Sequence, residues 1–337
     1  MNEPGMNSTW KSRPRAGGLA VLAAVAALLL PAQAGAQGRP QVVATVGMIG
    51  DVAAELAGDC ADVTVLMGPG SDPHLYRASA GDVRALARAD LVLYGGLHLE
   101  AGLADVLGSL AGRLPVVAVS ERAVPEGERI ATGLPGAGAY DPHVWMDVSL
   151  WARSVPVVAE ALAGAVGDDA ACRERVAAAA ESYSAQLAAL HDWAVRALAS
   201  VPAERRVLVT AHDAFAYFGR AYGVEVEGVQ GVSTETEAAV ADVRRVADLV
   251  VARGVPTLFI ESTINPRTVE AVREAVAARG GSAALGESLY ADALGDAGSP
   301  EGTYVGMVVH NVSAIVEGLG GEAPPLPAKL ESWAARW

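Results

Sequence analysis

Short apolar runs alternate with amphipathic stretches along most of the chain, which is the pattern of an α/β fold. In the first half, the apolar runs predict strands and the stretches between them predict helices. The expected strands are Gln41–Val46, Val63–Leu66, Leu91–Tyr94 and Val116–Val119, and the expected helices are Asp51–Leu56, Ala78–Arg88 and Glu100–Leu110. The Gly- and Pro-rich segment Val124–Ala139 predicts a long surface loop.

Residues 168–199, in the middle of the chain, contain neither proline nor glycine. Six apolar or small positions recur there at helical spacing and predict one buried face: Val176, Tyr183, Leu187, Leu190, Ala194 and Ala197. A helix of this size would be on the order of 45 Å long, and Pro202 would end it. Such a helix would join two lobes stiffly, unlike a Gly/Ser linker.

The alternation resumes after this helix. Strands are expected at Val207–Thr210, Val224–Glu227 and Thr257–Glu261, and helices at Ala214–Tyr222, Ala238–Arg253, Pro266–Arg279 and Tyr304–Glu317. We therefore predict two similar α/β lobes, residues 40–165 and 202–337, with central, mainly parallel sheets and one long rigid helix at 168–199 between them. A ligand cleft is expected between the lobes, where pockets of such proteins form.

The first 36 residues predict a cleaved secretory signal peptide. Lys11, Arg13 and Arg15 precede an uninterrupted small and apolar run, residues 18–30, and an A-x-A site follows at 34–36. As a helix this run would span about 20 Å, short of the roughly 30 Å of a membrane core, which disfavours the alternative of a retained anchor. No cysteine follows the run, so we expect a periplasmic protein without a lipid anchor.

The chain has 337 residues, of which 52% are hydrophobic, enough for two buried cores. Its formal net charge is −14, and removal of residues 1–36, with three basic side chains and one acidic one, would lower this by two to −16. An acidic chain is not expected to bind nucleic acid, which requires clustered Lys and Arg. The charge suits a cationic ligand, although solubility accounts for it equally.

Two cysteines, Cys60 and Cys172, lie far apart and in no C-x-x-C motif or Cys/His cluster. In an oxidising compartment they could pair, or they could remain free. We expect either of these states rather than metal ligation.

Two of the six histidines, His74 and His143, each end an Asp-Pro-His tripeptide. Proline fixes its own φ and favours an extended conformation of the preceding aspartate, so the imidazole is presented from a stiff turn. The aspartate could orient the imidazole or cap the local backbone. One such tripeptide fits an exposed His at a helix start, but two of them favour metal ligands.

Two further residues complete a candidate ligand set. His212 follows the apolar run 207–211, at the strand end where ligand sites of α/β proteins gather, and Asp213 could cap the next helix. Asp292 follows the expected last strand and precedes a glycine-rich turn. Three imidazoles and a carboxylate form a four-donor set that suits zinc and also accommodates manganese. The candidate metal ligands are His74, His143, His212 and Asp292.

We expect other roles for the remaining candidates. His191 lies on the long helix and is expected in solvent, whereas His98 and His310 are assigned to packing or to support of the ligands. Glu261 ends an expected buried strand, where it could be paired near the cleft or cap the next turn.

Five stretches carry a resemblance to a known family: GPGSDPHLY at 68–76, DPHVWMD at 141–147, TAHDAFAYF at 210–218, GVSTETE at 231–237 and LYADAL at 289–294. In this order they resemble the zinc/manganese solute-binding family of ABC importers, the ZnuA/TroA-like group (cluster A-I). The similarity covers essentially all of residues 40–320, so it is far more specific than a single short motif.

The resemblance implies two α/β lobes bridged by one long helix, with the metal buried between them. The first three ligand positions of the family fall on His74, His143 and His212, and its late aspartate falls on Asp292. Manganese carriers tend to have a glutamate at the third position, whereas many zinc carriers have a His-rich loop that residues 124–139 lack. We expect zinc as the first candidate and manganese as the second.

We therefore expect a periplasmic solute-binding protein that captures a divalent transition metal for an inner-membrane ABC permease, as a monomer and not as an enzyme. Four protein ligands leave no position open for a reacting water. One alternative is a secreted metal-dependent hydrolase, with Asp292 outside the metal's ligands and Glu261 as base, but no H-E-x-x-H, G-x-S-x-G or P-loop motif supports it. Another is a metal-binding adhesin, which the absence of a lipid anchor disfavours.

Overall fold

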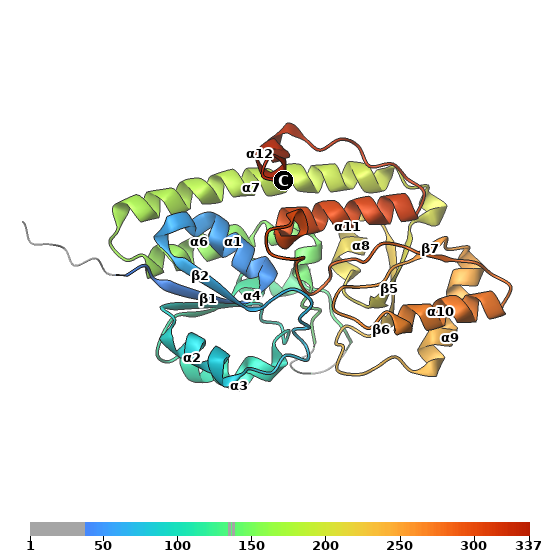
Figure 1. The fold of residues 1–337 in the computed structure, drawn as a ribbon, viewed down its shortest axis with the longest axis horizontal. Coiled ribbons are helices and arrows are strands. Elements are labelled where there is room, and N and C mark those ends of the chain that lie inside the picture. Colours follow the sequence, from blue (N-terminus) through green and yellow to red (C-terminus); the bar gives the residue numbers. More distant parts are fainter. Residues whose placement is uncertain (1–37, 134–135, 137–138) are drawn as a thin grey trace, which may run out of the picture. The chain divides into compact units, whose positions relative to one another are not determined.

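Each half of the chain forms one four-stranded parallel sheet in the computed structural model, which describes residues 38–133, 136 and 139–337 (Figure 1). The first sheet has the order β2-β1-β3-β4, and the second has the order β6-β5-β7-β8. In both, the first strand pairs with the second on one side and the third on the other, so the two sheets share one topology. The predicted α/β class is confirmed. The strands are β1 (Gln41–Val46), β2 (Asp62–Met67), β3 (Leu91–Tyr94), β4 (Val116–Ala118), β5 (Val207–His212), β6 (Glu225–Gln230), β7 (Thr257–Leu258) and β8 (Ala284–Leu285).

Helices connect the strands and cover both sheets. Several of their ends follow from local chemistry: Ser79 and Asp82 form a capping box at the start of α2, and Gly223 and Gly254 end α8 and α9 in the left-handed conformation. The first half contains α1 (Gly47–Ala57), α2 (Ala80–Arg88), α3 (Ala104–Leu110), α4 (Val119–Ala123), α5 (Val148–Trp151) and α6 (Ser154–Ala165). The second half contains α8 (Ala216–Tyr222), α9 (Val240–Arg253), α10 (Arg267–Ala278), α11 (Tyr304–Gly318) and α12 (Glu331–Ala334).

The predicted central helix is confirmed as α7 (Ala170–Ala199), which has 30 residues. Asp169 caps its start by accepting a hydrogen bond from the backbone N–H of Cys172, at 3.0 Å. All six positions that the sequence assigns to one face are buried. The helix packs against α1, α5 and α6 of the first half and against α8 and α11 of the second, so one continuous element contacts both halves.

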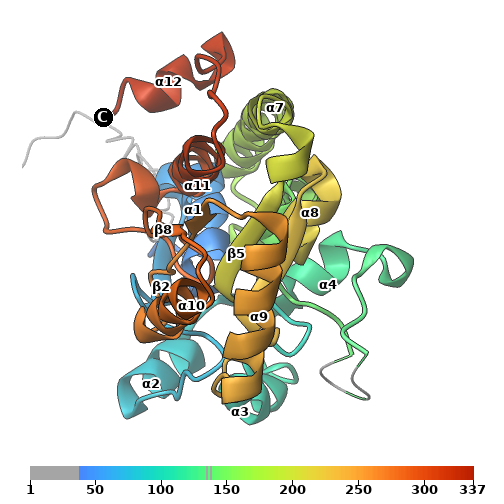
Figure 2. The same ribbon diagram turned by 90° about the vertical axis from the view of Figure 1, so that its right-hand side faces the viewer.

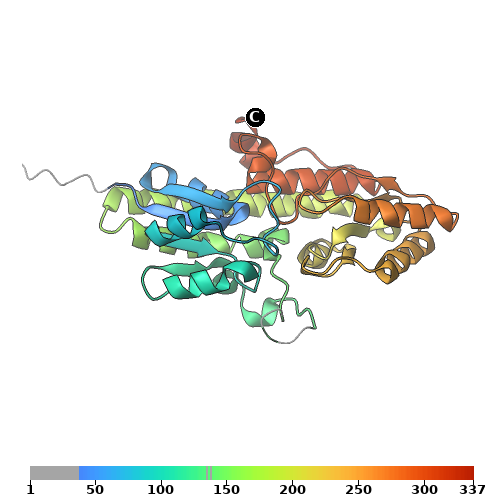
Figure 3. The same cartoon turned by 60° about the horizontal axis from the view of Figure 1, so that its bottom comes forward.

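A single hydrophobic cluster runs through both halves. It joins residues of β1 and β3 to the buried face of α7, to α8 and α11, and to Leu208 of β5. A second cluster packs Val207, Val209 and Ala211 of β5 against α9 and α10. This division follows from the period of two along a strand, and Figure 2 shows α7 and α11 above β5 and α9 and α10 below it. Figure 3 shows α11 alongside α7, as their packing contacts require.

The structure corrects several predicted boundaries. Helix α1 begins at Gly47 rather than at residue 51, because Met48 and Ile49 are buried in the first helical turn directly after β1. The expected strand Thr257–Glu261 ends at Leu258, and Glu261 pairs with Leu289 only in an isolated bridge. Val119 starts α4 instead of ending β4. The short elements β8, α4 and α5 and the strongly apolar α6 were not predicted, because they offer too few residues or too little amphipathic contrast.

Three other predictions concern the signal peptide, the limits of the two lobes and the surface loop at 124–139. The predicted signal peptide, residues 1–36, lies outside the described residues. Residues 39–337 cluster into one compact unit, and the lobe limits 40–165 and 202–337 remain predictions. In the expected surface loop, Val124 is buried and residues 126–128 form a 3₁₀ turn. Within the described part of the chain, no helix is both long and apolar enough to cross a lipid bilayer.

Cys60 and Cys172 form a disulfide bond, with their Cα atoms 5.5 Å apart. The bond joins the turn after α1 to the first turn of α7 and closes a loop of sequence separation 112. This decides between the two states that the sequence left open for the cysteines.

Removing this disulfide should destabilise the fold. In the chain-entropy model, a loop of about 100 residues gives up to about 5 kcal/mol, and typical measured values are about 2–4 kcal/mol. We expect the Cys60→Ser/Cys172→Ser variant to lose a free energy of unfolding in this range, measured by urea denaturation of the metal-free protein. Wild-type protein under reducing conditions is the matched control, and an unchanged denaturation midpoint in both samples would contradict the prediction.

Candidate metal centre

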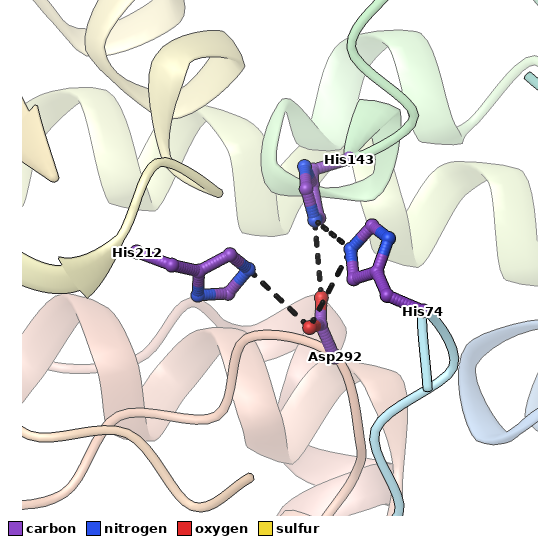
Figure 4. Close-up of side chains that lie close together, drawn as sticks. All are labelled: His74, His143, His212 and Asp292. Atoms are coloured by element: carbon purple, nitrogen blue, oxygen red, sulfur yellow. Dashed lines mark hydrogen bonds and ion pairs between the residues drawn. The ribbon is translucent and has the colours of Figure 1, made fainter. Parts of the chain in front are cut away.

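Four side chains from four separate segments converge on one point (Figure 4). Each of His74, His143, His212 and Asp292 offers one donor atom, and these atoms all lie within 4.8 Å of one another. The residues are almost fully enclosed, with exposed fractions of 6%, 0%, 0% and 1% in that order. The structure thus brings together the four residues that the sequence predicts as ligands, and their role as ligands remains a prediction.

The spacing of the donor atoms suits a small metal ion. Nε2 of His143 lies 3.3 Å from Nε2 of His74 and 3.2 Å from Oδ1 of Asp292. Oδ2 of Asp292 lies 3.3 Å from Nε2 of His212 and 3.9 Å from Nε2 of His74. Donors placed about 2.0–2.1 Å from a tetrahedral ion are themselves about 3.3 Å apart. The four residues therefore need little rearrangement to surround an ion the size of zinc.

Three polar atoms at the centre of this cluster lack a hydrogen-bond partner among the residues that the structure describes. They are Nε2 of His212 and both carboxylate oxygens of Asp292, and all three are buried. Unpaired polar atoms are rare in protein interiors because burying them costs about 1–3 kcal/mol each. A cation between the four residues would compensate all three atoms at once, which is the strongest structural sign of a metal site.

Both Asp-Pro-His turns use their aspartate to fix the backbone. Oδ1 of Asp72 accepts a hydrogen bond from the backbone N–H of His74 at 2.9 Å, and Oδ1 of Asp141 accepts one from the backbone N–H of His143 at 2.8 Å. Asp141 also accepts a hydrogen bond from Nδ1 of the His143 ring at 2.7 Å, which turns Nε2 toward the centre. Thus Asp141 performs both roles considered from the sequence, whereas Asp72 contacts the backbone of His74 and not its ring.

His212 is the last residue of β5 and is fixed by Glu261. One carboxylate oxygen of Glu261 accepts a hydrogen bond from the backbone N–H of His212 at 2.8 Å, and the other lies 2.6 Å from ring Nδ1. Glu261 is 3% exposed, so the alternative of a buried, paired carboxylate near the cleft is confirmed. Asp213 does not cap the next helix, although the sequence allowed this role. Helix α8 begins after Phe215 and has no side-chain cap.

Asp292 lies on a segment without regular secondary structure, and its backbone is fixed from two sides. Asn311 of α11 accepts a hydrogen bond from the backbone N–H of Tyr290 at 2.9 Å and donates one to its carbonyl at 2.7 Å. Trp145, two residues after His143, donates its indole N–H to the carbonyl of Ala291 at 2.9 Å. Neither supporting contact was predicted from the sequence, although a lone Asn within the apolar helix at 304–317 is a signal of a buried polar contact.

Neighbouring carboxylates determine the protonation of two of the imidazoles. Burial opposes a charge on His143, but Asp141 and Asp292 outweigh it and raise the pKa of His143 to about 9. Burial likewise opposes a charge on His212, yet Glu261 and Asp292 raise its pKa well above the ordinary value. For His74, burial outweighs Asp292 and lowers the pKa to about 3. Burial would raise the pKa of Asp292, but His212 and His143 hold it well below its usual range.

The other three histidines lie outside this cluster. His310 packs against Tyr290 and its Nε2 donates to the carbonyl of Ser288 at 2.9 Å, as its packing assignment predicts. His191 is half-buried against Tyr222 rather than in solvent, and His98 is exposed rather than packed. The exposure of His98 follows from a left-handed backbone, with φ of 67°, which turns its side chain out of the core.

Residues 42–318 match the ZnuA family, described as zinc-uptake complex component A, periplasmic. The chain belongs to this family. The match confirms the resemblance inferred from the five sequence stretches and covers both sheets, α7 and all four residues of the centre.

Two known relatives of this ZnuA-family chain are named for different metals. It is 49% identical to the zinc-binding protein TroA of Treponema pallidum over 287 residues, which cover 85% of this chain and 91% of the relative. It is 41% identical to the manganese-binding lipoprotein MntA of Bacillus subtilis over 280 residues, which cover 83% and 89% of the two chains. A solved structure of periplasmic zinc-binding TroA from Treponema pallidum matches with a TM-score of 0.79 and 48% identity over 84% of this chain and 99% of the other. The two-lobed solute-binding fold is confirmed.

The contact between Glu261 and His212 predicts that Glu261→Gln weakens metal binding. The amide retains the size of the carboxylate but loses the charge that orients and polarises the imidazole. Removing such a partner typically lowers metal affinity about 10–100-fold, and we expect this loss in zinc affinity by competition with a chelator. Glu160→Gln, at an exposed ion pair with Arg122, is the matched control and should bind like wild type. Equal affinity of Glu261→Gln and wild type would contradict the prediction.

Proposed function

We propose that this chain is the extracytoplasmic solute-binding protein of an ABC importer, which captures a divalent transition-metal ion and delivers it to a membrane permease. Zinc is the first candidate ion and manganese the second. The observation that carries the proposal is the buried cluster of His74, His143, His212 and Asp292. Nε2 of His212 and both carboxylate oxygens of Asp292 have no hydrogen-bond partner among the described residues.

The donor set favours zinc. Imidazole nitrogens suit zinc, whereas manganese prefers sites with more oxygen donors, and three of the four residues supply imidazoles. A given N/O site also binds zinc more tightly than manganese. Three contacts between donor atoms, at 3.2–3.3 Å, have the separation expected of tetrahedral ligands around a zinc-sized ion, and the contact of His74 with Asp292 is 3.9 Å.

One feature favours manganese as the second candidate. Both oxygens of Asp292 face the imidazoles, Oδ1 toward His143 and Oδ2 toward His212. If the carboxylate binds through both oxygens, the centre provides five donor atoms, which suits an ion of higher coordination number. The relative MntA is named for manganese, so titration of both ions is needed to rank them.

The arrangement supports storage and release of an ion rather than catalysis. A hydrolytic metal site keeps one position for water and needs a base beside it. Here all four donors point at the centre, and Glu261, the candidate base, is occupied by the backbone and ring of His212. We therefore propose a binding protein and not an enzyme.

An extracytoplasmic location has two independent supports. The matched family is described as periplasmic, and a disulfide such as Cys60–Cys172 forms and persists in oxidising compartments. We propose that residues 1–36 are removed on export and that the monomeric protein carries its ion to the permease.

A metal titration tests the proposal directly. The stripped wild-type protein should bind one zinc ion, with a higher thermal midpoint because the ion binds only the folded state. His143→Ala removes one donor atom and the imidazole that faces Oδ1 of Asp292. We therefore expect most of the zinc-induced thermal shift to be lost. His191→Ala, which alters a histidine on α7, should keep the full shift. Absence of a stoichiometric zinc or manganese complex in wild type would refute the proposed function.

Metal affinity should fall as the pH falls. An imidazole must be neutral to bind a metal, and the raised pKa values of His143, to about 9, and of His212 mean that protons compete with the ion at neutral pH. Each proton released on binding lowers the apparent affinity roughly tenfold per pH unit below the pKa. Isothermal titrations in buffers of different ionisation enthalpy should detect this release at pH 7.5.

The raised pKa of His143 also makes the stability of the metal-free protein depend on pH. This stability falls as the pH rises, whereas metal affinity increases. A raised pKa of His143 stabilises the fold at low pH, and this contribution disappears as the pH rises through about 9. The thermal shift on adding zinc should therefore be larger at pH 9 than at pH 6. Equal affinity at pH 7.5 and pH 5 would contradict a site with three histidine ligands.

A further inference from the structure

His74 is held differently from the other two imidazoles of the metal centre. Carboxylates bind ring Nδ1 of His143 and of His212 and fix the orientation of those rings. Among the described residues, no side chain hydrogen-bonds Nδ1 of His74, and its ring is positioned through its backbone N–H, which donates to Asp72. His74 is also the most exposed of the four, at 6%. It is therefore the ligand whose position depends most on its own loop.

That loop is tied to the opposite half of the protein by one hydrogen bond. Oδ1 of Asp72 accepts from the backbone N–H of His74, while Oδ2 accepts from the hydroxyl of Thr234 at 2.6 Å. Thr234 lies between β6 and α9, 162 residues away in the sequence, and is 6% exposed. A hydrogen bond to a carboxylate is about twice as strong as one between neutral groups. Through Asp72, the second half thus holds a ligand that the first half supplies.

The contact borders a cavity where the two halves meet. This cavity has a volume of about 390 Å³, and Asp72, Leu75 and Thr234 are among the residues that line it. Leu75 directly follows His74 and is 54% exposed, so the cavity is next to solvent at this point. The Asp72–Thr234 contact therefore lies on the side of the metal centre where a short movement of one loop would open it.

We propose that the Asp72–Thr234 hydrogen bond is a latch that keeps His74 in its coordinating position and so sets the rate at which the ion leaves. The latch rests on the proposed metal-binding function. When the bond opens, Asp72 and the turn that carries His74 lose their hold on the second half, while His143 and His212 stay fixed by their own carboxylates. Release then begins with His74, and Thr234 acts as a positioning residue that does not touch the metal.

The test compares three threonine variants in the full chain. Thr234→Val keeps the shape of the side chain and removes the hydroxyl, Thr234→Ser retains the hydroxyl, and Thr263→Val is the matched control. Thr263 lines the same cavity, and its buried hydroxyl has no hydrogen-bond partner among the described residues. Two quantities are measured: the rate of zinc dissociation into excess chelator, and amide hydrogen exchange of residues 70–76 in the metal-free protein.

We expect Thr234→Val to release zinc about 10–100-fold faster than wild type, since it loses a hydrogen bond to a carboxylate. We also expect faster exchange of residues 70–76 without metal. Thr234→Ser should restore both quantities, and Thr263→Val should change neither. A general loss of stability would accelerate exchange throughout the chain, so an increase confined to residues 70–76 separates the latch from misfolding.

Several outcomes would overturn the latch. These are an unchanged dissociation rate in Thr234→Val, unchanged exchange of residues 70–76, or an equal acceleration by Thr263→Val. A wild-type chain that takes up neither zinc nor manganese would refute the proposed function, whereas the exchange experiment on metal-free protein would still decide whether Thr234 holds this segment.

Discussion

The burial of Asp292 among three imidazoles is the constraint on which the rest of the structure depends. A carboxylate removed from water is costly unless positive charge or hydrogen bonds compensate it. Within the described part of the chain, neither oxygen of Asp292 has a hydrogen-bond partner. Compensation must come from the facing imidazoles when they are protonated, or from a metal ion. The raised pKa values of His143 and His212 reflect compensation by protonated imidazoles. Protons and metal therefore compete for one small, closed volume.

This volume is built from both halves of the chain, so its dimensions depend on how firmly the halves are held together. His74 and His143 come from the first half, and His212 and Asp292 from the second. A hydrophobic cluster that is continuous through α7 and α11 joins the two halves, and close-packed cores of this kind resist deformation. We therefore expect little hinge motion between the halves, with movement at the centre confined to short loops such as the one that carries His74.

Local patterns made much of the fold and of the candidate metal centre predictable from the sequence. The bounds of β1 and β3 and the long helix follow from apolar periodicity, His74 and His143 follow from the repeated Asp-Pro-His turn, and His212 follows from its place at a strand end. Asp292 by itself has the pattern of an ordinary loop carboxylate, and the family resemblance supports its assignment. The two-residue strand β8 has too little pattern to detect, and it exists because β7 is beside it. The exposure of His98 depends on an unusual local backbone conformation, whereas the contacts of His191 with Tyr222 and of Thr234 with Asp72 depend on distant segments. Their chemistry was visible in the sequence, but their neighbours were not.

The unequal support of the three imidazoles bears on the choice of metal. His143 and His212 are each fixed by a carboxylate on Nδ1, which sets two donor positions in advance. In the arrangement that we propose, His74 is held only through Asp72 and Thr234, and both oxygens of Asp292 face the centre. The ring of His74 can shift, and the carboxylate of Asp292 can bind through one or two oxygens. The centre can therefore offer four donors at zinc distances or five donors around a larger ion. A family whose relatives are named for zinc and for manganese could in this way differ in metal while keeping one fold.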